Sequence, residues 1–248
     1  MQVFDGWLCG GTRNEATGAQ VWCTQDGLNW NLKSFGGLGY MMDIVENVAV
    51  TSGYVFNRGL YFSVQNVGVN VNNGADDVAV LYRTTDLLGE PTWQEVLRSE
   101  AAGGQMTILG EFQGALYVSY QGTQGIRIMR SVSGDPNTWE QVNLDGMNKS
   151  PDNRTSSVDG AVIYKDSLYI SISNETSGVQ LWRTIGQKGE GGSTLTWEAV
   201  ATDGLGDAAN ISAQLVVFEG ALLAWTTNPR SGQQVRQTVC NLQASDNR

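Results

Sequence analysis

The sequence predicts an all-β protein, a β-propeller of five four-stranded antiparallel blades, and three observations lead to this fold class. One short, mostly apolar segment occurs five times along the 248 residues. Each copy is followed by further short apolar runs separated by Gly, Asn and Asp, which is typical of strands joined by tight turns. No segment has the i, i+3, i+4 apolar spacing of a long helix. A repeat of about 50 residues built only from short strands is typical of a propeller blade.

The repeated segment opens on a leucine in every copy. The copies are GWLCGGTRN (6–14), GLYFSVQN (59–66), ALYVSYQG (115–122), SLYISISN (167–174) and ALLAWTTN (221–228), with Leu8, Leu60, Leu116, Leu168 and Leu222 at steps of 52, 56, 52 and 54. We expect one domain over 1–248, with repeats at about 3–42, 43–105, 106–158, 159–210 and 211–248.

The third repeat predicts the four strands of one blade, A to D, most clearly. They are MTILGEF (106–112), ALYVSYQ (115–121), IRIMRS (126–131) and TWEQV (138–142). Strand B is largely apolar on both faces, as a blade packed between two neighbours requires. The last repeat has no Trp for strand D, so we expect an open blade edge through which the protein could self-associate.

A small residue lies three positions after the leucine in four repeats, where the neighbouring blade must approach closely. These residues are Gly11, Ser63, Ser119 and Ser171. The fifth repeat has Trp225 instead. Two interpretations stay open: Trp225 fills a gap between blades, or it is a platform for a ligand.

An arginine of strand C recurs as Arg83, Arg130 and Arg183. Each precedes a Trp of strand D, so a guanidinium packed over an indole face is expected. Recurrence in several repeats indicates a packing role, because a catalytic Arg would be expected in one blade only.

The charge pattern excludes several function classes. The net charge is −10, which argues against binding to nucleic acid or to an anionic membrane surface. There is no His, so Ser/His/Asp and Cys/His nucleophiles are excluded. No apolar run is long enough to cross a membrane, and no signal peptide precedes MQVFDGW. Either the chain is cytoplasmic or it has been cut from a longer precursor, and the richness in Gly, Asn, Thr and Trp favours an extracellular or cell-surface protein. We expect no cofactor.

Two of the three cysteines, Cys9 and Cys23, lie in consecutive strands of the first repeat. A turn at 14–18 places opposite each other the positions whose numbers sum to 32, as 9 and 23 do. A cross-strand disulfide in an oxidising compartment is one interpretation. Two buried free thiols are the other and the simpler one. Cys240 has no expected partner.

The segment TQDGLNW (24–30) resembles the Asp-box of sialidase-type bacterial propellers, S/T-x-D-x-G-x-x-W/F, and is one residue shorter. The resemblance implies that Thr24 and Asp26 bond the amides of the turn around Gly27, with Trp30 packed beneath. It also implies a structural corner remote from the binding face. Looser copies are TTDLLGEPTW (84–93), SVSGDPNTW (131–139) and TIGQKGEGGSTLTW (184–197).

The enzymatic branch of that family has three Arg on the substrate carboxylate, a Tyr–Glu nucleophile pair and an Asp acid/base. The strand C Arg residues here recur by repeat, and no Phe-Arg-Ile-Pro element is present near the start. The resemblance therefore implies a non-catalytic member, and we expect no enzyme activity.

A row of asparagines predicts the binding face. Because strands A and C run parallel, the B–C and D–A loops share one face of a propeller. Six residues after the leucine lie Asn14, Asn66, Asn174 and Asn228. With Tyr40, Tyr120 and Trp225 they could bind the hydroxyls and the ring face of a sugar. Equally, Asn tolerates left-handed turns and bonds its own backbone.

Asp76 and Asp77 lie in the long B–C loop of the second repeat, NVGVNVNNGADD. A solvated turn is the simpler interpretation, and a weak Ca²⁺ site is the other. No other metal ligands stand out.

These observations favour a non-enzymatic, lectin-like module that binds a glycan or a protein partner. The alternative is a structural scaffold subunit of a surface assembly. A glycoside hydrolase is the second alternative, because the spacing of two carboxylates cannot be read from sequence.

Overall fold

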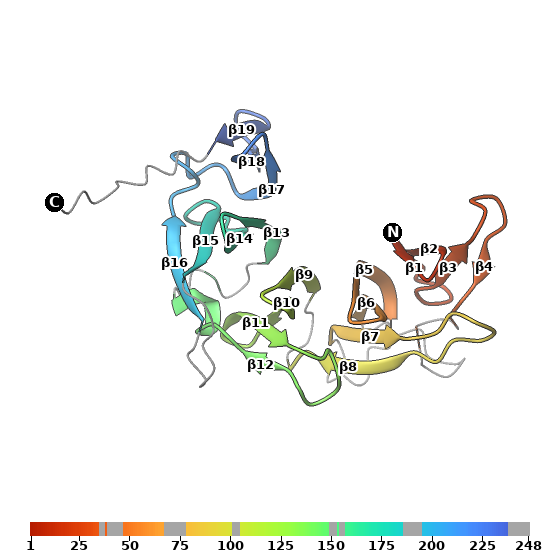
Figure 1. Cartoon of the computed structure of the whole chain (residues 1–248). Helices are drawn as coiled ribbons and strands as arrows, with labels where there is room; N and C mark the ends of the chain where they lie inside the picture. Colours follow the sequence, from red (N-terminus) through yellow and green to blue (C-terminus); the bar gives the residue numbers. More distant parts are fainter. Residues whose placement is uncertain are drawn as a thin grey trace. The chain divides into compact units, whose positions relative to one another are not determined.

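The computed structural model describes residues 1–34, 38, 47–66, 78–100, 105–148, 153, 157–185 and 195–237 (Figure 1). The described part is built from antiparallel strands and one short 3₁₀ segment, η1 (Asp145–Asn148). No helix in these ranges is long and apolar enough to span a membrane.

The strands form five separate sheets, each in chain order. The first contains β1 (Gln2–Phe4), β2 (Trp7–Gly11), β3 (Val21–Thr24) and β4 (Asn31–Leu32). The second contains β5 (Asn47–Phe56), β6 (Gly59–Asn66), β7 (Val80–Thr84) and β8 (Gln94–Arg98). The third contains β9 (Met106–Phe112), β10 (Ala115–Gly122), β11 (Gly125–Ser131) and β12 (Glu140–Gln141). The fourth contains β13 (Val158–Tyr164), β14 (Ser167–Ile172), β15 (Gln180–Ile185) and β16 (Thr196–Ala201).

The fifth sheet contains β17 (Ser212–Phe218), β18 (Ala221–Thr227) and β19 (Gln234–Gln237). The predicted all-β fold with five blade-like sheets is therefore confirmed, and its class is the β-propeller. The expected four strands are present in the first four sheets, whereas the described part of the fifth has three.

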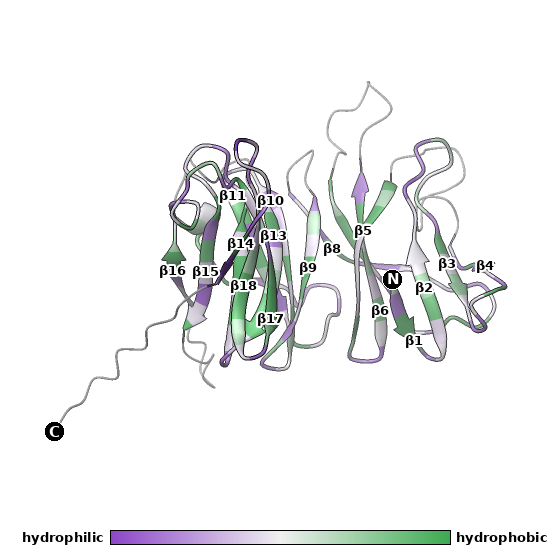
Figure 2. Ribbon diagram, turned by 90° about the horizontal axis from the view of Figure 1, so that it is seen from above, coloured by the Kyte–Doolittle hydropathy of each residue, from purple (hydrophilic) through white to green (hydrophobic). Residues whose placement is uncertain are grey.

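The chain divides into two compact units. The first comprises Met1–Val158 with Ile185–Trp197, and the second comprises Asp159–Thr184 with Glu198–Arg248. The expectation of one domain over 1–248 stays a prediction. Figure 2 shows that β14, β17 and β18 of the second unit are largely apolar along their length.

Small residues on the second strand of the first four sheets allow close packing, as expected. A Cβ on Gly11 would collide with the side chain of Val50 on β5. The Ser63 hydroxyl lies 2.8 Å from the Thr51 hydroxyl. In the second unit, the Ser171 hydroxyl donates to the Ala213 carbonyl over 2.5 Å. These positions have no space for a larger side chain.

The recurring strand C arginines do not stack on tryptophan as expected. Each lies directly opposite a tyrosine of strand B. Arg183 approaches the Tyr169 hydroxyl at 3.4 Å and donates to Glu198 over 2.7 Å. The hydroxyl opposite in register and the acid on the neighbouring strand offer charge-assisted hydrogen bonds, which outweigh a contact with an indole face. The expected packing role is nevertheless confirmed, with different partners.

Trp93 and Trp197 of strand D use their indole N–H groups instead, whereas the buried indole nitrogen of Trp139 has no hydrogen-bond partner within the described ranges. Trp93 donates to the carbonyl of Lys33 over 2.7 Å, and Trp197 donates to the carbonyl of Val142 over 2.9 Å. Both bonds reach strand D of the preceding repeat. They therefore fasten consecutive repeats within the first unit.

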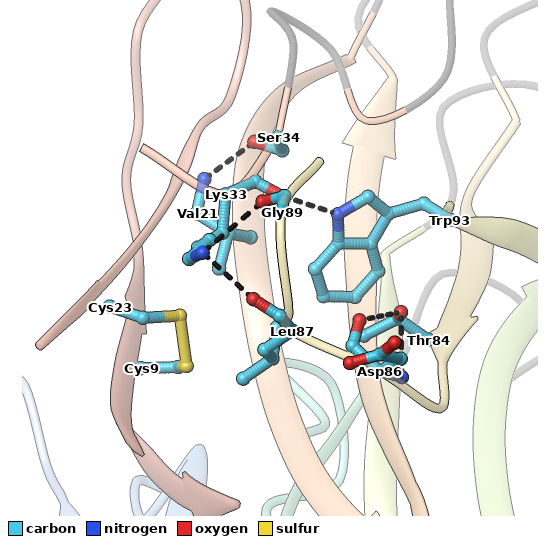
Figure 3. Close-up of a disulfide and its surroundings, with 10 residues drawn as sticks. All are labelled: Cys9, Val21, Cys23, Lys33, Ser34, Thr84, Asp86, Leu87, Gly89 and Trp93. Atoms are coloured by element: carbon cyan, nitrogen blue, oxygen red, sulfur yellow. Dashed lines mark hydrogen bonds between the residues drawn. A yellow bond between two sulfur atoms is a disulfide. The ribbon is translucent and has the colours of Figure 1, made fainter. Parts of the chain in front are cut away.

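Cys9 and Cys23 form a disulfide, so the simpler expectation of two free thiols is wrong (Figure 3). The predicted register is confirmed, because Cys9 lies opposite Cys23 and Leu8 opposite Thr24. The spacing predicted which two residues lie opposite each other, but it did not predict whether their sulfurs are bonded. Cys240 lies outside the described residues.

A buried lysine lies close to this disulfide (Figure 3). The Lys33 ammonium donates to the carbonyls of Leu87 and Gly89 over 2.7 and 3.2 Å. It also lies 4.7 Å from the centre of the Trp7 ring. Carbonyl oxygens and a ring face thus stabilise the buried charge.

Candidate functional site

The Asp-box-like corner has the hydrogen bonds that the resemblance implied. The Thr24 hydroxyl accepts from the Gly27 amide over 2.9 Å, and Asp26 accepts from the amides of Leu28 and Asn29 over 2.8 and 2.7 Å. The bonds from Asn29, together with those from Leu28 and Thr24, hold the pKa of Asp26 well below its usual range. Trp30 differs from the expectation, because it is 40% exposed. The corner satisfies its own polar groups and thus stabilises a turn.

Three of the four predicted asparagines cap their own turns. The side-chain oxygen of Asn14 accepts from the amides of Ala16 and Thr17 over 2.9 and 3.0 Å. Asn174 and Asn228 accept in the same way from the second and third residues after them, over 2.8 to 3.0 Å. Asn66 is buried at the end of β6. The backbone interpretation accounts for these three residues, and a ligand role for the row stays a prediction.

A polar pocket lies in the first unit, at the ends of the strands that lead into the B–C and D–A loops. Its volume is 170 Å³. It is lined by Gln65, Gln105, Thr107, Ser119, Tyr120, Gln121, Ile126, Ser157 and Val158. Of the predicted ligand-binding residues, Tyr120 belongs to this pocket. Trp225 lies in the second unit and lines a different pocket.

Next to Tyr120, one guanidinium holds two carboxylates. Arg127 donates to both oxygens of Asp145 over 3.1 and 3.3 Å and forms an ion pair with Glu100. Gln141 donates to Asp145 over 2.6 Å. The side chains of Arg127 and Asp145 are 18% and 27% exposed, whereas that of Glu100 is 60% exposed. The cluster therefore contains one sheltered acid and one accessible acid.

The cluster fixes the protonation states around the pocket. Burial alone would raise the pKa of Asp145, but hydrogen bonds from Arg127 and Gln141 outweigh it and the pKa is lowered. Burial raises the pKa of the Tyr120 hydroxyl, although its hydrogen bond with Arg127 acts in the opposite direction. The charges of Glu100 and Asp145 also raise the Tyr120 pKa. At neutral pH the site therefore presents an ionised carboxylate and a neutral phenol.

Neither Arg127 nor its carboxylate partners were predicted, although the sequence contains a signal for Arg127. Arg127 lies opposite Tyr120 in the B–C ladder. The corresponding positions in the other repeats are Gln20, Val80, Gln180 and Gln234. Arg127 is thus an arginine confined to one blade, the pattern expected of a functional arginine.

Other predicted groups are not placed by the structure. Asp76, Asp77 and Tyr40 lie outside the described residues. Within the described ranges, no group of three or more acidic or Cys side chains could hold a metal ion.

No protein-family model matches the chain. No curated protein matches it either. Among solved structures, it is similar to an exo-β-1,3-galactanase from Phanerochaete chrysosporium, with a TM-score of 0.53 and 13% identity over 91% of this chain. Others are a GH43 β-1,3-galactosidase (TM-score 0.49, 12% identity, 95% of this chain) and a GH43_1 enzyme from Xanthomonas citri (TM-score 0.46, 11% identity, 96% of this chain).

The matches cover 55%, 54% and 85% of those three chains, so this chain spans about half the length of the first two. At this identity the similarity to the galactanase shows the fold alone.

The comparison contradicts the predicted non-enzymatic, lectin-like module and the expectation of no enzyme activity. The galactanase is a glycoside hydrolase, which agrees with the second alternative. The sequence argument excluded His-dependent nucleophiles and the sialidase set. Glycoside hydrolysis requires only two suitably placed carboxyl groups. Their separation depends on the fold and cannot be derived from their spacing in the sequence.

Proposed function

We propose that this chain is the propeller of a glycoside hydrolase and that the pocket beside Tyr120 receives the sugar. The observation that carries the proposal is the pair of carboxylates, Asp145 and Glu100, held by Arg127, which lies directly opposite the pocket residue Tyr120. Two carboxyl groups on either side of the scissile bond are the usual requirement for this chemistry. The similarity in fold to a galactanase supports the same reaction class.

Each residue of the cluster has a distinct role in this proposal. Asp145 stays ionised through its bonds with Arg127 and Gln141, so it stabilises the positive charge that develops on the sugar or activates water. Glu100 is the more exposed of the two acids, so we assign to it the contact with the leaving oxygen. Arg127 is a positioning residue, and the Tyr120 hydroxyl binds the sugar.

The pocket size limits the unit that is enclosed. Pockets that enclose a drug-sized ligand measure about 300–1,000 Å³. At 170 Å³ this pocket encloses a single sugar ring, while the rest of the substrate stays outside. We therefore expect release of terminal sugars.

Hydrolysis of aryl glycosides of galactose, arabinose and xylose, and of β-1,3-linked galacto-oligosaccharides, tests the proposal. We expect turnover by the wild-type chain and a loss of about 100-fold or more in kcat/KM for Asp145→Asn. Asp135→Asn is the matched control, because Asp135 forms a comparable ion pair with Arg83 over 2.7 Å and does not belong to the Arg127 cluster. Its kcat/KM should stay within about twofold of wild type.

Two outcomes contradict the proposal. One is no turnover on any of these substrates. The other is an equal loss in Asp145→Asn and Asp135→Asn, since that would indicate a general structural effect.

We also propose that the protein works in an oxidising compartment, which the extracellular prediction requires. The Cys9–Cys23 disulfide supports this, since such bonds persist mainly outside the reducing cytosol. Alkylation of the protein as isolated, followed by mass spectrometry, should leave both cysteines unmodified. Alkylated Cys9 and Cys23 would contradict it.

A further inference from the structure

Trp225 on β18 is 53% exposed, whereas its counterparts in the three preceding repeats, Ser63, Ser119 and Ser171, are buried. The counterparts are small residues packed against a neighbouring strand, as Gly11 is against Val50 and Ser171 is against Ala213. An indole would not fit in such a position. The exposure supports the platform interpretation.

A pocket of 620 Å³ in the second unit includes this indole. Trp225 lies directly opposite Gln214, and Ser212 lies directly opposite Thr227. Asp159 and Gln233 also line the pocket. Its volume is within the range of about 300–1,000 Å³ that is typical of ligand sites.

We propose that Trp225 and this pocket form a carbohydrate-binding site for a neutral oligosaccharide. A sugar ring has an apolar C–H face, which packs on an indole, and a rim of hydroxyls. Amide, hydroxyl and carboxylate side chains such as Gln214, Gln233 and Asp159 supply the donors and acceptors for that rim. The pocket contains one acid and no Lys or Arg, which disfavours an anionic sugar.

This site goes beyond the proposed hydrolysis and does not depend on it. It shares no lining residue with the pocket beside Tyr120. A second attachment point would retain a polymer on the protein by raising the effective concentration of its other segments.

Affinity electrophoresis of the full chain in gels containing soluble β-1,3-galactan, arabinan or xylan tests the site. We expect retardation by at least one of these polymers. Trp225→Ala should raise the dissociation constant about tenfold or more, since it removes the exposed apolar surface. Trp30→Ala is the matched control, because Trp30 is also a partly exposed Trp, at 40%, and should change binding less than about twofold.

A second variant covers the case in which Trp225→Ala fails to fold. Gln214→Ala should weaken binding about two- to tenfold, as expected for one hydrogen bond. Turnover of a small aryl glycoside should be unaffected by either variant, which separates this site from the proposed catalytic one. Circular dichroism confirms that each variant is folded.

Three outcomes overturn the proposal. The first is no retardation of the wild-type chain by any of the three polymers. The second is unchanged binding in folded Trp225→Ala. The third is a change of oligomeric state in Trp225→Ala on gel filtration with polymer binding intact, because Trp225 would then belong to a protein interface.

Discussion

The D–A loops that follow the third and fourth sheets are each held by one buried asparagine, the loop anchor, which is Asn153 after the third sheet and Asn210 after the fourth. The residues next to the two anchors differ. In the third, Arg127 at the start of strand C binds Asp145 of the following D–A loop. In the fourth, the corresponding Gln180 accepts from the indole of Trp182 over 3.0 Å. The corresponding loop acid, Asp203, accepts from the amide of Gly206 in its own turn over 3.3 Å.

The loop anchor itself is an asparagine that is fully buried in both sheets. Asn153 donates to the carbonyl of Gly146 over 3.0 Å, and Asn210 donates to the carbonyl of Gly204 over 2.8 Å. The first sheet has the Gln–Trp pair again, with Trp22 donating to Gln20 over 3.1 Å. The Gln–Trp pair thus occurs in the first and fourth sheets, and in the third sheet Arg127 stands in place of its Gln.

The largest effect should come from making the third sheet resemble the fourth. Arg127→Gln removes the cation that orients Asp145 and Glu100, so kcat/KM should fall about 100-fold or more. Arg183→Gln is the control, because Arg183 recurs in the repeats and bonds Tyr169 and Glu198. Kinetics with the best aryl glycoside should show unchanged kcat/KM in Arg183→Gln. A loss confined to Arg183→Gln would reverse the assignment of the two arginines.

Removing the Gln–Trp pair from the fourth sheet should lower the stability and leave the activity unchanged. Gln180→Leu leaves the indole N–H of the buried Trp182 without its acceptor, which costs about 1–3 kcal/mol of unfolding free energy. Urea denaturation measures this difference. Gln20→Leu should cost less, because Trp22 is partly exposed and its N–H has access to water. An equal cost in both variants would mean that burial does not set the difference.

The fold was predictable because its signal is repeated. Five copies of one strand pattern, and the register that places Cys9 opposite Cys23, both follow from spacing along the chain. The Arg–Tyr pairs were not predicted, since side-chain partners across a sheet depend on which hydroxyl or acid lies in reach. The recurring asparagines were predicted to bind a ligand, but three of them cap their own turns.

The candidate site was less predictable, because it arises where the repeat is broken. Arg127 and Tyr120 each replace a neutral or smaller residue found in the other copies, and their carboxylate partners come from two different D–A segments. Glu100 and Asp145 are 45 residues apart in sequence (145 − 100), so spacing gives no signal for the pair. Only the packed sheets bring them to one guanidinium.

The shared anchor predicts a loss of stability in both loops. Asn153→Ala and Asn210→Ala each leave a buried carbonyl without its donor, so each should lower the unfolding free energy by at least about 1 kcal/mol. Urea denaturation of the two variants side by side tests this. Asn29→Ala is the control, since its side chain donates to Asp26 at an exposed corner and should cost less than about 0.5 kcal/mol. A cost in either anchor variant no larger than that of Asn29→Ala would contradict the anchoring role.

The smallest effect concerns pH. The pKa of Asp145 in the folded protein is below its unfolded value of about 3.9, so the ionised form is favoured on folding. Its contribution to stability is therefore fully present above pH 4 or so and is lost as the pH falls through the folded pKa. Asp145→Asn should flatten the dependence of unfolding free energy on pH in that acidic range and leave its shape at neutral pH unchanged.

Arg127→Gln should flatten this pH dependence too, because burial then acts on the Asp145 carboxyl without the guanidinium that outweighs it. Thermal unfolding followed across this pH range for the three proteins measures the effect, and a wild-type slope in Arg127→Gln would mean that Gln141, not Arg127, sets the charge of Asp145.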